Sequence, residues 1–204
     1  MAVSKHRKQK QNFASFSKRQ AFEALELDDL TPWQPKIDPL PPSDFFILRR
    51  QRLQQFDLES YEESKKLLID AICEEAIQGF DQLKIWKGAA IESDQFTGHA
   101  DYAIAPNRRY FALPLLCIIE AKKDDFEQGL AQCLVEMQAC HGCNQQAGHT
   151  MPIFGIVTNG STWYFYQRLT SGEVYESLPY AIGQLEMVLG FLRYIFAACQ
   201  GNLA

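Results

Sequence analysis

The sequence lacks the features that mark several classes of protein. No apolar run follows the basic N-terminus, so no secretory signal is predicted there. The longest apolar stretch, residues 185–199, contains Glu186 and Arg193 and is short for a bilayer span, which favours a buried helix and no membrane partner. No internal repeat is present. We therefore expect a cytoplasmic protein whose six cysteines are reduced.

An excess of positive charge is also absent. The 204 residues include 20 Lys and Arg against 25 Asp and Glu, for a formal net charge of −5, which excludes a polybasic coat for nucleic acid. With 47% apolar and 22% charged residues, the composition is globular and a core needs no disulfide or metal staple. The charge is uneven: residues 1–22 carry +6 and the remainder −11.

A closed zinc site would need ligands that the sequence does not supply. Cys140 and Cys143 form one Cys-x-x-Cys pair around His141, with His149 nearby, but no second pair follows. A structural zinc ion takes four ligands, so ordinary helix-end and loop cysteines are the favoured interpretation. A zinc-stabilised interaction module remains an alternative.

The distribution of proline divides the chain. Five of the nine prolines fall in residues 31–44, which predicts an extended segment without ladder hydrogen bonds. We interpret residues 1–44 as a loose basic arm, with room for one short helix, followed by a proline-rich linker. Trp33 and Ile37 are expected to lie against the domain, which comprises residues 45–204.

Hydrophobic periodicity predicts a mixed α/β domain. A helix is expected from Ser60, with a capping box between Ser60 and Glu63, and later helices over 126–141 and 182–199. The expected strands are 84–91, 99–105, 115–122, 153–158 and 162–168, and Asn159-Gly160 predicts a hairpin between the last two. This order favours a central mixed sheet of about five strands, flanked by helices, with 115–122 buried at its centre.

Charged residues end the most apolar of these strands. Glu120 and Lys122 are two residues apart and so share a face, and Asp101 lies on the preceding strand. Two converging carboxylates repel each other unless a cation is present, and Mg²⁺ is often held by only one or two carboxylates. The carboxylates favour the ammonium form of Lys122, so this lysine should act by its charge rather than as a base. A cation and a lysine together suit a reaction that develops negative charge on phosphate oxygens.

The pattern Asp101, eighteen residues, Glu120-x-Lys122 resembles the PD-(D/E)xK superfamily of restriction-endonuclease-like nucleases, over about residues 60–168. The resemblance implies Mg²⁺- or Mn²⁺-dependent hydrolysis of nucleic acid, DNA before RNA. It implies Asp101 and Glu120 as metal ligands, the Ala121 carbonyl facing the ion, and Lys122 as the motif lysine. Ala100 replaces the proline that commonly precedes the aspartate.

The resemblance also implies further groups at the site. One is an acid from the first helix, and the spacing of Leu68 and Ile72 favours Glu75 over Glu74. Another is the glutamine that some branches place on the following helix, for which Gln128 and Gln132 are available.

Three residues are candidates for contact with nucleic acid: Arg108, Arg109 and Gln132. The two arginines precede Tyr110 in a predicted loop, where a solvated turn is the alternative. The basic arm would add non-specific phosphate affinity. A catalytically inactive protein of the same fold, acting as a binding or assembly subunit, is the alternative function. The C-terminal apolar helix could serve as core or as a homodimer face.

Overall fold

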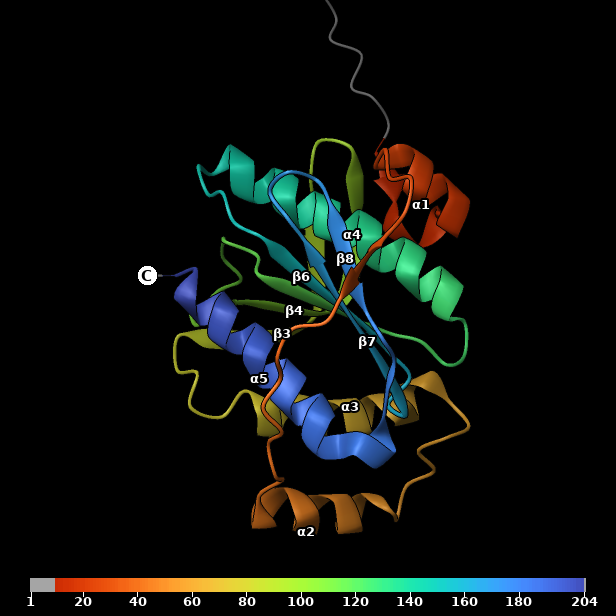
Figure 1. Ribbon diagram of the computed structural model, residues 1–204, viewed down its shortest axis with the longest axis vertical. Coiled ribbons are helices and arrows are strands. Elements are labelled where there is room, and N and C mark those ends of the chain that lie inside the picture. Colours follow the sequence, from red (N-terminus) through yellow and green to blue (C-terminus); the bar gives the residue numbers. More distant parts are fainter. Residues whose placement is uncertain (1–9, 204) are drawn as a thin grey trace, which may run out of the picture.

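The computed structural model describes residues 10–203, which form a mixed sheet of nine strands with helices on both faces (Figure 1). The strands are β1 (Gln11–Asn12), β2 (Thr31–Trp33), β3 (Leu83–Glu92), β4 (Phe96–Pro106), β5 (Cys117–Ala121), β6 (Ile153–Thr158), β7 (Thr162–Arg168), β8 (Val174–Ser177) and β9 (Tyr180–Ala181). The α-helices are α1 (Lys18–Ala24), α2 (Asp44–Leu53), α3 (Glu62–Ala76), α4 (Phe126–Gln146) and α5 (Leu185–Gly201), and short 3-10 turns occupy Phe13–Ser15 and Ile182–Gln184.

The sheet confirms the mixed α/β class but is larger than expected. Its strand order is β1-β4-β5-β6-β7-β8-β2, with β3 paired to β4 and β9 to β7. The β5–β6 pair is parallel, whereas β3–β4, β4–β5 and β6–β7 are antiparallel. The prediction of about five strands is wrong because β1, β2, β8 and β9 are two to four residues long, too short to show an alternating pattern.

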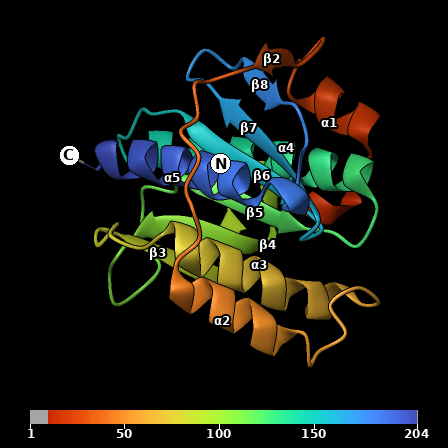
Figure 2. The same cartoon turned by 60° about the horizontal axis from the view of Figure 1, so that its bottom comes forward.

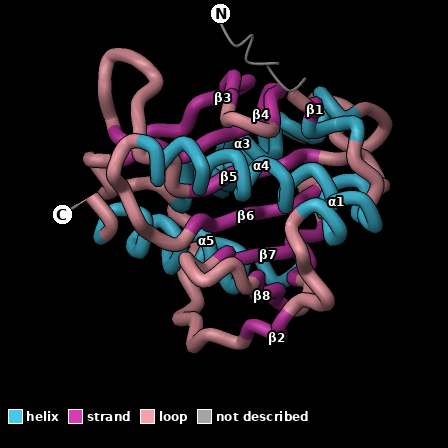
Figure 3. Tube along the Cα trace, turned by 90° about the horizontal axis from the view of Figure 1, so that it is seen from above, coloured by secondary structure: helices cyan, strands magenta, loops and turns pink. Residues whose placement is uncertain are grey.

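Two cores sandwich the sheet. One core lies between the sheet and α3 and α5, and the other lies under α4 and α1. The bottom face with α2, α3 and α5 comes forward in Figure 2, and the face with α4 and α1 is seen in Figure 3. Every residue of β5 is buried, so the prediction of a buried central strand is confirmed.

The described part of the N-terminal arm is not loose. β1 pairs in parallel with β4, α1 packs on α4, and Phe13 and Phe16 are buried in the core under α4. The single short helix expected there is α1, which begins at a capping box formed by Ser17 and Gln20. Lys5, Arg7 and Lys8 lie outside the described residues.

The proline-rich segment both joins the sheet and crosses α5. Thr31–Trp33 pairs in parallel with Tyr175–Ser177, so the expectation of no ladder hydrogen bonds is wrong for these three residues. An edge strand tolerates Pro32 because only alternate residues bond to the neighbour. As expected, Trp33 lies against the domain, where it contacts Phe191, and Ile37 packs on the same core.

The start of α3 differs from the prediction. Its N-cap is Tyr61, whose side chain forms no capping hydrogen bond, and the expected capping box is absent. The carboxylate of Asp57 accepts the N–H of Ser60 at 3.1 Å instead. A turn therefore occupies these residues, and the helix starts at Glu62.

α4 extends beyond the predicted end at residue 141. Its last turns are anchored by Asn144, whose amide bonds to both the N–H and the carbonyl of Leu115. Cys140 is consequently a buried residue inside the helix, and the Cys143 thiol donates to the Glu92 carbonyl. The cysteine pair therefore lies within α4 rather than at a helix end and loop.

α5 is a core helix in this structure. Together with the preceding turn it covers residues 182–201, a stretch long and apolar enough by length and composition to cross a membrane. One such helix is weak evidence, because core helices pass the same test. Val188, Leu189, Phe191 and Ile195 are fully buried, so the apolar face that suggested a homodimer is used inside the protein.

Candidate active site

The site lies where β4 and β5 part. Their ladder ends with Tyr102 opposite Ile119. The next pair in this register, Asp101 and Glu120, does not extend it, and Asp101 Oδ2 instead accepts the N–H of Ala121 at 2.9 Å. Because the N–H and C=O of one strand residue point the same way, the Ala121 carbonyl also lies on the Asp101 side.

The two carboxylates share one face of the sheet. Side chains alternate along a strand, so Asp101 faces the same side as Ala103, and Glu120 the same side as Ile118. Both of those residues belong to the core under α4. Asp101 and Glu120 therefore share one face at the end of the central strand, as predicted, and the charge of Asp101 acts on Glu120. That their oxygens can share one cation stays a prediction.

A chain of buried polar groups extends from Glu120 into α4. Lys122 Nζ lies 2.6 Å from Glu120 Oε1 and donates to Gln132 Oε1 at 3.1 Å. Gln132 Nε2 in turn donates to Glu136 Oε1 at 3.0 Å. Glu136 is fully buried, and the second carboxylate oxygens of Glu120 and Glu136 have no hydrogen-bond partner among the described residues.

A second lysine approaches from the first turn of α3. Lys66 Nζ lies 2.9 Å from Asp101 Oδ1 and 2.8 Å from Glu63 Oε1, with Glu62 Oε1 at 3.6 Å. Asp101 is therefore neutralised by Lys66, and Glu120 by Lys122. The cluster contains two lysines and five carboxyl groups: Lys66, Lys122, Glu62, Glu63, Asp101, Glu120 and Glu136.

Burial and charge set the ionisation of the cluster. Burial first, and the charge of Asp101 second, raise the pKa of Glu120 to about 7, although Lys122 opposes this. Burial, together with the charge of Glu120, raises the pKa of Glu136 well above its ordinary value. For Lys122, burial lowers the pKa but the charge and hydrogen bond of Glu120 outweigh it, so the net pKa is raised. Lys122 is thus a cation, as its surroundings in the sequence indicated.

Glu74 and Glu75, the two acids of α3 that the sequence offered for the site, are not at this cluster. Glu75 accepts the backbone N–H and the hydroxyl of Ser43, the N-cap of α2, and Glu74 pairs with Arg49 on α2. Glu75 is nine residues beyond Lys66, about 13 Å along the helix. The prediction that Glu75 completes the site is therefore not supported. The acids of α3 that approach the cluster are Glu63, which pairs with Lys66, and Glu62, whose charge acts on both Glu120 and Lys122.

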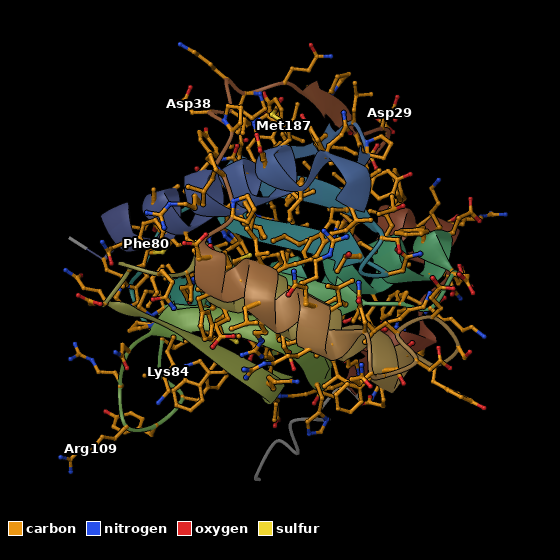
Figure 4. All side chains as sticks on the ribbon, turned by 90° about the horizontal axis from the view of Figure 1, so that it is seen from below. Asp29, Asp38, Phe80, Lys84, Arg109 and Met187 are labelled. Carbon is orange, nitrogen blue, oxygen red and sulfur yellow. The ribbon has the colours of Figure 1, made fainter. Side chains whose placement is uncertain are left out.

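The candidates for nucleic-acid contact are also placed differently. Arg108 and Arg109 are exposed in the loop that leads into the start of β5, whereas Glu120 lies at the other end of that strand. Figure 4 shows Arg109 projecting outward from this loop. Gln132 is buried and both of its amide atoms are bonded inside the protein, so it holds Lys122 rather than a surface ligand. Gln128 donates to the Ala14 carbonyl.

Four residues of the cluster were missed: Glu62, Glu63, Lys66 and Glu136. Glu136 had a signal, since it is the only charged residue between Gly129 and Cys140 and lies four residues after Gln132. Glu62 and Lys66 occupy a charged first turn of a helix, which usually faces solvent, so their sequence pattern carried no signal.

The donor set fits a hard divalent ion in part. In residues 10–203, no three His, Cys, Asp or Glu side chains are arranged to hold a metal ion. Asp101, Glu120 and the Ala121 carbonyl supply oxygen donors, and Glu120 Oε2 is a buried, unpartnered oxygen. Mg²⁺ and Mn²⁺ accept such incomplete protein shells when water and phosphate complete them. These oxygen donors fit such an ion if the Lys66 ammonium moves away from the Asp101 carboxylate.

Comparison with known proteins gives little guidance. No family model matches the chain. Crinkler effector protein 5 of Phytophthora infestans is 44% identical over 54 residues, which is 26% of this chain and 14% of that protein. The chain thus spans a small part of this relative, and a match of that length shows no family.

Proposed function

We propose that the chain is a metal-dependent nuclease of the PD-(D/E)xK type that hydrolyses phosphodiester bonds, with DNA as the first substrate and RNA as the second. The observation that carries the proposal is that Asp101 and Glu120 lie on one face of the sheet just beyond the end of the β4–β5 ladder, with Lys122 2.6 Å from Glu120. A restriction-endonuclease-like core would comprise β3–β7 with α3 and α4.

The residues of the chain have separate roles in this proposal. Asp101, Glu120 and the Ala121 carbonyl would hold a Mg²⁺ or Mn²⁺ ion, which when bound polarises a phosphoryl oxygen and lowers the pKa of a bound water. Lys122 would stabilise the charge that develops on the phosphate, because its raised pKa keeps it protonated. Gln132 of α4 accepts a hydrogen bond from the Lys122 ammonium, and Glu136 holds Gln132 in place.

The alternative is a catalytically inactive nuclease-fold protein that binds nucleic acid or assembles with partners. Its specific support is the ion pair of Lys66 with Asp101, which neutralises one proposed ligand without any metal. The negative net charge also favours it mildly.

A cleavage assay separates the two functions. Linear, circular and single-stranded DNA, and RNA, are incubated with the protein and Mg²⁺ or Mn²⁺. Lys122→Met should lose about a hundredfold or more in rate, because a charge aimed at the transition state is worth on the order of 3 kcal/mol. Asp101→Asn should lose activity together with metal affinity.

The matched control is Lys84→Met. Lys84 is an exposed lysine of β3 that bonds to the Arg108 carbonyl, away from the cluster, and this variant should cleave as the parent does. If Lys122→Met cleaves at the parental rate, the nuclease proposal fails. If no substrate is cleaved and no metal binds, the inactive alternative replaces it.

A further inference from the structure

Lys66 occupies an unusual position for a helix-surface lysine. It lies in the first turns of α3, yet its side chain is only 13% exposed, because the ammonium points toward β4. It contacts Asp101 at 2.9 Å and Glu63 at 2.8 Å, with Glu62 at 3.6 Å. Three carboxylates thus surround one cation.

The carboxylates hold this ammonium firmly. Partial burial by itself lowers the pKa of Lys66, but hydrogen bonds and charges from Glu63 and Asp101 outweigh it and raise the pKa above its ordinary value. Lys66 is therefore charged at every physiological pH. The Asp101 oxygen that it contacts is Oδ1, while Oδ2 is held by the Ala121 N–H.

These contacts leave Asp101 with no unshared oxygen. Asp101 Oδ1 is paired with the Lys66 ammonium and Oδ2 accepts the Ala121 N–H, so a divalent ion that binds Asp101 must lie close to the ammonium. Each carboxylate oxygen has a second lone pair, but two cations at one partly buried carboxylate repel each other strongly. Glu63 is 84% exposed and Glu62 is 41% exposed, so both can keep the ammonium after it leaves Asp101.

We propose that Lys66 is a built-in competitor of the divalent cation at Asp101: metal entry moves its ammonium from Asp101 onto Glu63 and Glu62, and loss of metal returns it. The inference rests on the proposed function, because it concerns the same carboxylates. Lys66 sets the metal concentration at which the site fills, and it keeps Asp101 paired when the site is empty of metal.

The test is a calorimetric titration of the full chain with Mn²⁺. Lys66→Met should bind Mn²⁺ about tenfold or more tightly than the parent, because the competing charge is gone while Asp101, Glu120 and Ala121 remain. Lys66→Arg keeps the charge and can hold a carboxylate through two N–H groups, so its affinity should be no higher than the parent's. Asp101→Asn should bind Mn²⁺ more weakly than the parent.

Lys87→Met is the matched control. Lys87 makes a similar pair with α3, 2.7 Å from Asp70, but does not contact Asp101, so its removal should leave Mn²⁺ affinity near the parental value. Circular dichroism of each variant establishes that it is folded. If Lys66→Met does not fold, Lys66→Gln, which keeps a polar side chain without charge, replaces it.

The outcomes separate this inference from the nuclease proposal. Equal Mn²⁺ affinity of the parent and Lys66→Met overturns the competition while leaving the nuclease proposal standing. Tighter Mn²⁺ binding by Lys66→Met, with no cleavage by the parent or any variant, supports the competition and contradicts the nuclease proposal. Absence of Mn²⁺ binding from all variants overturns both.

Discussion

Ionisation of the Glu120 carboxyl group is less favourable in the folded protein than in water. The side chain of Glu120 is 1% exposed, the charge of Asp101 acts on it, and its Oε2 has no hydrogen-bond partner within residues 10–203. Its pKa of about 7 follows from that environment, and the proximity of Lys122 does not fully offset it. A bound cation would lower this pKa by favouring the carboxylate.

The pH dependence of stability follows from the raised pKa of Glu120. Below about pH 4.5 the carboxyl is protonated in both folded and unfolded chains. As the pH rises to about 7, the folded state retains the proton longer, so the free energy of unfolding falls across this interval and then levels. Glu120→Gln should lack this fall, and above pH 7 in chelator it should be more stable than the parent by roughly 3 kcal/mol. Urea unfolding at several pH values measures both.

Glu23→Gln is the comparison variant, because Glu23 is an exposed residue of α1. It should follow the parental pH profile. A profile of Glu120→Gln that is parallel to the parent's would show that Glu120 titrates normally.

At the scale of elements, the close contact between the proline-rich segment and α5 fixes the path of the chain. The N–H of Leu40 donates to the Glu186 carbonyl at 2.9 Å, and the backbone at Asp38 lies against Gly190 of α5. Figure 4 shows Asp38 and Met187 on the same side of the molecule, where the segment crosses the helix. Gly190 permits this crossing because it has no Cβ.

Replacement of Gly190 by alanine should therefore destabilise the protein. The added Cβ would overlap the Asp38 carbonyl oxygen, and backbone cannot move aside as a flexible side chain can. We expect a loss of about 1 to 3 kcal/mol in the free energy of unfolding. Gly201→Ala is the control, since a Cβ added there on the same helix would meet no other described group within 4 Å, and alanine should be neutral or slightly stabilising. A neutral Gly190→Ala would mean that the segment does not rest on α5.

At the scale of the whole molecule, the described arm is part of the folding unit. Phe13 is 1% exposed and its ring lies against Gly98 of β4, while Phe16 contacts Phe96 edge to face. The sheet continues into this segment through β1. β4, which carries Asp101 of the candidate site, is therefore packed in part against residues 11–16.

The variant Phe13→Ala tests whether the described arm unfolds together with the rest of the domain. The loss of a buried aromatic ring should cost about 3 to 5 kcal/mol in a single cooperative transition. Phe45→Ala is the control, because Phe45 is 61% exposed on α2 and should change stability little. A loss at Phe13 below about 0.5 kcal/mol would indicate that the arm detaches without unfolding the domain. Denaturant unfolding with two spectroscopic probes gives the measurement.

The sequence by itself determined the central elements and the core of the site. The apolar run before Glu120 could only be buried, and the period of two placed Lys122 beside Glu120 on one face. Asp101 followed because its strand is the neighbour in both sequence and space. Helices α3, α4 and α5 and the five longer strands were predictable for the same reason, since burial leaves a periodic pattern along the chain, whereas α2 (Asp44–Leu53), with Phe46 as its one buried residue, was not predicted.

Only the tertiary structure decided which residues from elsewhere complete the cluster. The rotation of α3 turns Glu75 toward α2 and brings Lys66 to Asp101, and no local pattern in the helix records that rotation. The pairing of short edge strands and the burial of Phe13 likewise depend on partners distant in sequence. Local periodicity reports whether a side chain is buried, whereas the identity of its neighbour depends on how the elements pack.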